Sequence, residues 1–112
     1  MSRLPTKVWI DSLRRAVSAH GDFATVIRSG DPDAGAVILL LRDRADTYWG
    51  YSRTNLGDGT TGWQELPGSG AEDRNKLDES LEKQRRYDPD LWILELDVAD
   101  PARFIVELPG LS

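Results

Sequence analysis

The triplet Asp-Pro-Asp occurs twice, placing carboxylates at Asp31 and Asp33 and again at Asp88 and Asp90. Carboxylate oxygens bind hard cations such as Ca²⁺ and Mg²⁺, and paired carboxylates can exchange protons in acid–base catalysis. A calcium-type loop also needs further acids at fixed steps and a late bidentate glutamate, which both triplets lack. We therefore interpret the triplets as tight turns, since proline beside aspartate and glycine is typical of turns. The alternative is a small-ligand or metal-dependent enzyme in which the two turns meet in space.

The other residues show no sequence pattern of a known catalytic site. The chain has no cysteine, which excludes disulfides, thiolate metal sites and a cysteine nucleophile. Its one histidine, His20, follows a predicted helix, where an imidazole usually caps the last carbonyl groups. No G-x-S-x-G nucleophile pattern and no convincing phosphate loop are present. We therefore expect no cofactor and no metal, and we favour a protein that is not an enzyme.

Arginine and aromatic side chains form a different candidate site. Arg14 and Arg15 lie on the polar side of the first predicted helix, and Trp49, Tyr51 and Arg53 lie on a predicted hairpin. Both residue types are enriched at protein interfaces, so we interpret these five residues as a contact surface for a protein partner. The aromatic rings could instead fill the core or stack on RNA bases. The net charge of −5 disfavours a nucleic-acid partner.

Length and hydrophobic spacing predict the first elements that position these residues. The whole chain, 1–112, is expected to be a single domain. A helix over 6–20 is predicted from apolar residues three and four apart, with Gly21 closing it. Its buried face would consist of Trp9, Leu13, Ala16, Val17 and His20. Segments 23–29 and 36–43 are predicted to form a hairpin in which the second, continuously apolar strand is central.

A second hairpin and a second helix are predicted next. Segments 47–53 and 61–66 are strand-like and are joined by an Asn- and Gly-rich loop, which is the pattern of a hairpin. Ser69 and Glu72 match a capping box at the start of a helix over 71–87. The apolar stripe of this helix is narrow and consists of Leu77, Leu81 and Tyr87. This helix should therefore lie on the surface.

Two more strands complete the predicted fold, one over 91–97 and a short terminal one over 103–108. The order is α-β-β-β-β-α-β-β. Strands that outnumber helices without regular alternation favour an α+β domain with a largely antiparallel sheet and two helices.

Three blocks of the sequence, "KVWIDSLRRA", "RSGDPDAGAVILLL" and "YDPDLWILELD", resemble a family of small, mostly alphaproteobacterial proteins catalogued as domain of unknown function 1491. The blocks occur in the family's order, and Asp-Pro-Asp segments are among its hallmarks. Residues 47–72 depart from the family pattern, so a site there would be peculiar to this chain. The resemblance implies a cytoplasmic, single-domain protein and supplies no activity, cofactor or catalytic residues.

The start of the chain and its apolar runs predict where the protein resides. The first residues lack an apolar signal core, and the longest purely apolar run covers 36–41, far short of a membrane span. Together with the absence of cysteine, this favours the cytoplasm and no membrane partner. The sequence thus predicts a non-enzymatic binding or protein-interaction module.

Overall fold

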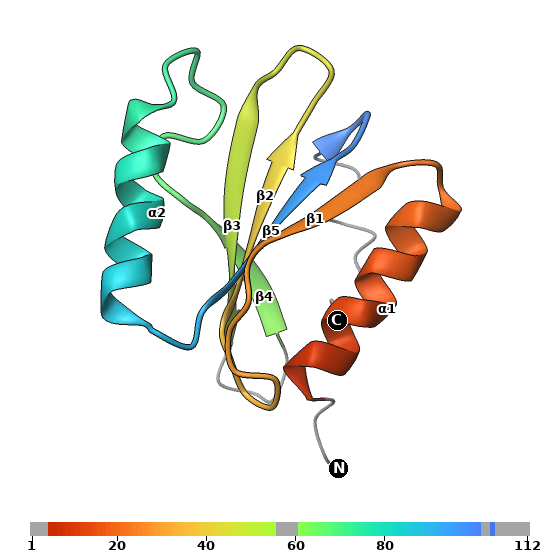
Figure 1. Ribbon diagram of the computed structural model, residues 1–112. Coiled ribbons are helices and arrows are strands. Elements are labelled where there is room, and N and C mark those ends of the chain that lie inside the picture. The colour runs from red at the N-terminus through yellow and green to blue at the C-terminus, as the bar shows by residue number, and fades with distance from the viewer. Residues whose placement is uncertain (1–4, 56–60, 102–103, 105–112) are drawn as a thin grey trace.

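The computed structural model describes residues 5–55, 61–101 and 104. The elements follow in the order α1 (Thr6–Ala19), β1 (Phe23–Arg28), β2 (Val37–Arg42), β3 (Tyr48–Asn55), β4 (Thr61–Glu65), α2 (Asn75–Tyr87) and β5 (Trp92–Asp97). Two helices and a five-stranded, mostly antiparallel sheet confirm the predicted α+β class. Figure 1 shows the two helices on opposite sides of the sheet.

The strands lie in the order β1-β5-β2-β3-β4. β1 pairs with β5, β2 with β3 and β3 with β4 in antiparallel fashion, and β2 pairs with β5 in parallel. The second predicted hairpin, β3 and β4, is therefore confirmed. The middle of its connection, 56–60, lies outside the described residues.

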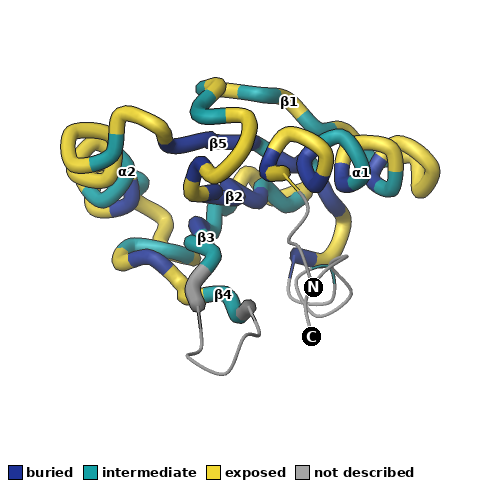
Figure 2. The backbone as a smooth tube through the Cα atoms, turned by 90° about the horizontal axis from the view of Figure 1, so that it is seen from below, coloured by how far each residue is buried: buried dark blue, intermediate teal, exposed yellow. Residues whose placement is uncertain are grey.

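The first predicted hairpin is wrong, because β5 lies between β1 and β2. All five residues of β2 from Val37 to Leu41 are buried, as are four of the six residues of β5. Two strands that are apolar on both faces are best placed side by side in the centre of a sheet. β1 alternates between exposed and half-buried residues, which suits an edge. Figure 2 shows this contrast between β1 and the buried strands β5 and β2.

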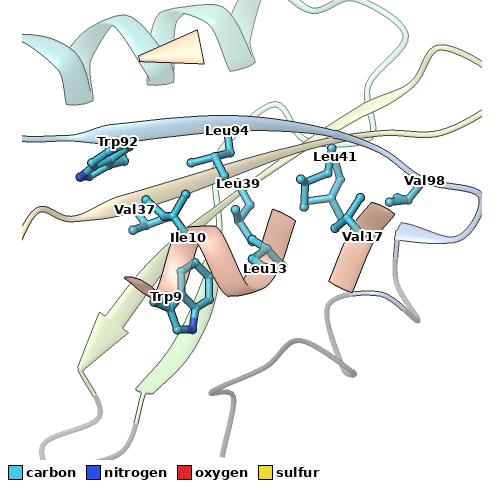
Figure 3. Packing of buried hydrophobic residues seen from close by; sticks show 11 residues of the cluster. Trp9, Ile10, Leu13, Val17, Val37, Leu39, Leu41, Trp92, Leu94 and Val98 are labelled. Carbon is cyan, nitrogen blue, oxygen red and sulfur yellow. The ribbon is translucent and has the colours of Figure 1, made fainter. Parts of the chain in front are cut away.

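One hydrophobic core lies between α1 and the sheet. Ile10, Leu13 and Val17 are at most 1% exposed and pack against β2 and β5 (Figure 3). The buried face of α1 thus includes Ile10 and leaves His20 exposed, in contrast to the predicted face. His20 donates from Nδ1 to the carbonyl oxygen of Ala16 at 2.9 Å, as expected of a residue at the helix end. Gly21, with φ of 78°, follows it.

The second core lies on the other face, beneath α2. Leu77 is fully buried there and Leu81 is partly buried, as predicted for a narrow contact. Tyr87, the third residue of the predicted stripe, is instead 79% exposed. A Cβ on Gly50 would lie 3.0 Å from a methyl carbon of Leu77, so this core packs closely against the backbone of β3.

The predicted capping box at Ser69 and Glu72 is wrong, because α2 begins only at Asn75. Instead, the Oγ of Ser69 accepts a hydrogen bond from the N–H of Gly50 at 2.9 Å. The chain after β4 therefore continues alongside β3 before it turns into the helix.

Most of the predicted terminal strand, 103–108, lies outside the described residues. Phe104 is its one described residue, and it is helical, with its N–H donating to the carbonyl oxygen of Asp100 at 3.0 Å. The side chain of Phe104 packs against the core beneath α1.

Candidate functional site

The two Asp-Pro-Asp turns, far apart in the sequence, meet through backbone groups. The N–H of Asp31 donates to the carbonyl oxygen of Asp90 at 3.0 Å. The indole Nε1 of Trp92 donates to the carbonyl oxygen of Asp31 at 2.7 Å. The guanidinium group of Arg28 donates to the carbonyl oxygen of Pro89 at 2.8 Å. These bonds join the loop before β2 to the loop before β5.

The first turn also caps α1, which begins without a side-chain cap. The first N–H groups of a helix have no partner within it and need other acceptors. Here the N–H groups of Thr6 and Lys7 donate to the carbonyl oxygens of Asp33, at 3.0 Å, and Pro32, at 2.8 Å. The Oγ1 of Thr6 also donates to the carbonyl oxygen of Gly35 at 3.0 Å. The turn therefore fixes the start of α1 on the sheet.

Two carboxylates of these turns bond to their own turns. Asp31 accepts from the N–H of Ala34 at 2.9 Å, and Asp88 accepts from the N–H of Asp90 at 3.0 Å. The side chains of Asp33 and Asp90 are exposed. No group of three or more His, Cys, Asp or Glu residues that could hold a metal ion is found in the described part of the chain. The arrangement holds two loops together at one end of the sheet.

Arg14 and Arg15 border a groove between α1 and the edge strand β1. Two adjoining pockets of about 640 Å³ and about 480 Å³ follow this side of the helix and share Asp11, Arg14 and Ala24. The helix contributes side chains three or four residues apart, which therefore share one face: Lys7, Asp11, Arg14, Arg15 and Ser18. The floor comes from the α1 side of β1, at Ala24 and Val26.

Positive charge is in excess in this groove. Among the described lining residues the charged side chains are those of Lys7, Arg14 and Arg15, which are cationic, and Asp11. The Nζ of Lys7 donates to a carboxylate oxygen of Asp11 at 2.8 Å. This hydrogen bond, with the nearby positive charges of Lys7, Arg14 and Arg15, holds the pKa of Asp11 below its usual value. Asp11 therefore stays ionised and is already engaged by Lys7.

The backbone directions in β5 determine which groups of β1 face the open edge. The N–H of Trp92 donates to Ala36 at 2.8 Å and that of Val98 donates to Arg42 at 3.0 Å, so both point toward β2. Successive residues of a strand direct their backbone groups to opposite sides. Residues 93, 95 and 97 of β5 therefore direct theirs toward β1.

The backbone N–H and C=O groups of alternate β1 residues face the open edge of the sheet. Phe23 and Thr25 stand opposite residues 97 and 95 of β5, whose backbone groups point toward them. By the same alternation, the N–H and C=O groups of Ala24 and Val26 point away from the sheet, and no strand within the described part of the chain pairs with β1 on that side. The open edge thus offers two donors and two acceptors beside the groove.

The opposite face of β1 carries exposed apolar side chains. Phe23 is 71% exposed and Ile27 is 54% exposed. Glu95 and Asp97 of the neighbouring β5 are half-buried on this same face, which is the face of Leu40 and of the core beneath α2. The two sides of the β1 edge therefore differ. The α1 side carries Lys7, Arg14 and Arg15, whereas the other side carries exposed apolar groups beside Glu95 and Asp97, with Arg42 next to Asp97 on β2.

The remaining predicted contact residues lie on β3. The guanidinium carbon of Arg53 lies 5.0 Å from the ring centre of Trp9, whose ring is 5.8 Å from that of Trp63. Tyr51 packs against the same core. Trp49 lies beside Gly70, where an added Cβ would be 2.9 Å from the indole Nε1. These side chains join β3 and β4 to α1 and to the start of the α2 loop.

The structure divides the predicted contact surface into two parts. β5 and β2 separate β1 from β3, which places these two strands roughly 14 Å apart at a strand spacing of about 4.8 Å. Arg14 and Arg15 belong to the groove beside β1, while Trp49, Tyr51 and Arg53 belong to β3. The free edge of β1 and its residues Phe23 and Ile27 were missed, although the alternating pattern of "FATVIR" is typical of an edge strand.

The fold defines a class of small α+β proteins in which a mixed five-stranded sheet lies between two helices. Residues 4–106 match the model of a family described as protein of unknown function (DUF1491), and the chain belongs to this family. No curated protein matches the sequence.

Solved structures are similar to this one along nearly the whole chain. A crystal structure of a DUF1491 family protein from Caulobacter crescentus CB15 is 36% identical, has a TM-score of 0.78 and covers 88% of this chain and 91% of that chain. An NMR structure of a DUF1491 family protein from the same organism is 36% identical, has a TM-score of 0.79 and covers 96% of each chain. A solution structure of a protein from A. tumefaciens, 24% identical with a TM-score of 0.73, covers 93% of each chain and shares the fold.

None of the helices in the described residues is both long enough and apolar enough to cross a membrane.

Proposed function

We propose that this protein is an interaction module that binds an extended segment of a protein partner along the open edge of β1. The outward-facing N–H and C=O groups of Ala24 and Val26, directly beside the α1/β1 groove, carry the proposal. An extended peptide that adds to a sheet edge gains affinity from main-chain hydrogen bonds and specificity from pockets for alternate side chains. The edge and the groove together supply both elements.

The irregular register of β1 limits the length of such a segment. Between Val26 and Arg28 the pairing with β5 shifts, which is the mark of a β-bulge. Bulges bend an edge strand and end regular pairing, and proteins use them to prevent open-ended association. Regular pairing is therefore available only from Phe23 to Val26, which suits a short segment and a reversible complex.

The alternative of a metal-dependent enzyme at the Asp-Pro-Asp turns has less support. The carboxylates of Asp31 and Asp88 are occupied by N–H groups of their own turns. The contacts between the two turns run through backbone carbonyl groups, together with side-chain donors from Arg28 and Trp92. The hydrogen bonds within and between the two turns therefore support a structural role, in which they hold the two loops together.

A proline at position 24 provides a specific test. Ala24→Pro removes one outward N–H group while leaving the hydrogen bonds to β5, and proline is tolerated on an edge strand where its nitrogen faces solvent. Ala24→Ser retains the N–H group and is the matched control. Random seven-residue peptides would be selected for binding to the wild type, and the selected peptides would be measured against both variants.

We expect the selected peptides to shift the amide resonances of Ala24 and Val26 in NMR spectra of the wild type. Ala24→Pro should weaken their binding at least about tenfold, because roughly one hydrogen bond between the peptide and β1 is lost. The circular dichroism spectrum of this variant should remain that of the native fold. Ala24→Ser should bind like the wild type. Equal binding by folded Ala24→Pro, shifts confined to another surface, or a failure to select any peptide would contradict the proposal.

A further inference from the structure

We infer that the partner segment carries acidic side chains at alternate positions, with uncharged apolar side chains between them. This inference rests on the proposed strand addition at β1 and specifies the chemistry of the segment that binds there. The side chains of an added strand alternate between the two faces of the sheet, so each face selects every second residue.

On the α1 side, alternate side chains of the segment enter the groove. Arg14 and Arg15 are exposed there, and the one carboxylate among the described lining residues, Asp11, is already bonded to Lys7. Arginine presents planar, bidentate donors that match carboxylates. An acidic side chain entering the groove therefore meets two guanidinium groups, whereas a lysine side chain would be repelled by them.

On the opposite side, the intervening side chains lie next to Phe23 and Ile27. These two apolar side chains are largely exposed in the free protein, so apolar neighbours on the added strand would remove them from water. Glu95 and Asp97 occupy the adjacent positions on β5 and would repel an acid there.

The different charges of the two faces also fix the register. A slip of one residue would exchange the two sets of side chains and place the acids against Glu95 and Asp97. The chain as a whole carries a net charge of −5, so its overall field does not attract an acidic peptide. The selectivity must come from the local cations, and it should weaken as salt is added because exposed charges are screened.

Three synthetic peptides, VEVEV, VSVSV and VKVKV, each capped at both ends and labelled, provide the probes. Their dissociation constants would be measured by fluorescence anisotropy at low and high salt. The test variant is Arg14→Glu with Arg15→Glu. The matched control is Arg85→Glu with Arg86→Glu, because these adjacent arginines are exposed on α2 and the change in net charge is the same.

At low salt the wild type should bind VEVEV more tightly than VSVSV, and VKVKV most weakly. Exposed ion pairs change affinity by about two- to fivefold each, so VEVEV should bind about tenfold more tightly than VSVSV in the presence of two arginines. The Arg14/Arg15 variant should reverse the order of the three peptides. The Arg85/Arg86 control should retain the order of the wild type.

The possible results separate this inference from the proposed function. If all three peptides bind equally and Ala24→Pro abolishes binding of each, strand addition stands and the acidic preference is overturned. The preference is likewise overturned if the Arg14/Arg15 variant keeps the order of the wild type. If Ala24→Pro binds the peptides as well as the wild type does, the proposed function itself fails. If none of the three peptides binds at low salt, the acidic preference is overturned, and the peptide selection separately decides the proposed function.

Discussion

The N–H of Asp31 donates a hydrogen bond to the carbonyl oxygen of Asp90, 3.0 Å away, although the two residues are separated by three strands and a helix along the chain. Each residue belongs to an Asp-Pro-Asp turn. The bond holds the entry to β2 beside the entry to β5, and these two strands form the parallel pair at the centre of the sheet. The turns thus set the register of the most buried strands.

The glycines beside this contact should be intolerant of any side chain. A Cβ on Gly30 would overlap the carbonyl group of Asp90, and one on Gly35 would lie 2.5 Å from the same oxygen. Gly30→Ala or Gly35→Ala should lower the free energy of unfolding by about 3 kcal/mol or more, since backbone atoms would have to move. Gly21→Ala is the control, because nothing lies within 4 Å of its Cβ position and only its φ of 78° opposes alanine. We expect a loss of about 1 kcal/mol there by urea denaturation, and equal losses at all three positions would contradict this explanation.

Trp92→Phe should weaken the same junction through a lost hydrogen bond. The indole Nε1 donates to the carbonyl oxygen of Asp31, and phenylalanine has no donor. The expected decrease in the free energy of unfolding is about 1–3 kcal/mol, because the acceptor lies in a part-buried contact. Trp63→Phe, in a half-buried ring that stacks on Trp9, should lose less than about 1 kcal/mol. Thermal unfolding should be monitored by circular dichroism, because removing a tryptophan changes the fluorescence of the protein. An equal loss of stability in the two variants would argue against the importance of the hydrogen bond.

Ser69→Ala should destabilise the sheet and leave the start of α2 unaffected. The Oγ of Ser69 accepts from the N–H of Gly50, so alanine leaves this part-buried donor without its partner. A loss of about 1 kcal/mol is expected. Glu72→Ala should change stability by less than about 0.5 kcal/mol, because Glu72 is exposed and precedes the helix by three residues. Similar losses from the two variants, measured by urea denaturation, would contradict the role of the Ser69–Gly50 hydrogen bond.

Tyr51 should make stability depend on alkaline pH. Burial, followed by the charge and hydrogen bond of Glu65, raises the pKa of Tyr51 above the ordinary value of 10.0. The folded chain therefore holds this proton more tightly than the unfolded chain does. The resulting stabilisation is fully present below the unfolded pKa and is lost as pH rises through the folded pKa. Lysines also titrate in this range, so the comparison with Tyr51→Phe isolates the tyrosine.

The measurement for Tyr51 is the difference in free energy of unfolding between the wild type and Tyr51→Phe at pH 7 and pH 11. This difference should shift against the wild type at the higher pH. A difference that does not change with pH would show that Tyr51 ionises equally in the folded and unfolded chains.

Repeats of the sequence pattern every two or every three to four residues predicted most of the buried positions, although the face predicted for α1 omitted Ile10 and included the exposed His20. The continuous apolar run from Val37 to Leu41 predicted a central strand. Such patterns do not determine which strand pairs with which, so the insertion of β5 beside β1 could not be predicted from "FATVIR" and "LWILELD".

The candidate site was predicted only in part for the same reason. The exposed positions of Arg14 and Arg15 follow from helix spacing, but their place beside β1 depends on how α1 sits on the sheet. That placement is set by the bonds from Thr6 and Lys7 to the first turn. Long-range contacts of this kind leave no periodic signal in the sequence.

The position of β5 between β1 and β2 also affects how the protein is made. β5 is the last of the five described strands to be synthesised, so both of its neighbours emerge from the ribosome with an open side where it will later insert. Until then the apolar run of β2 lacks a partner strand on one side, in a chain that is being made at about 5–20 residues per second. A nascent chain that ends before Trp92 should therefore recruit chaperones, and release from them should coincide with the emergence of β5.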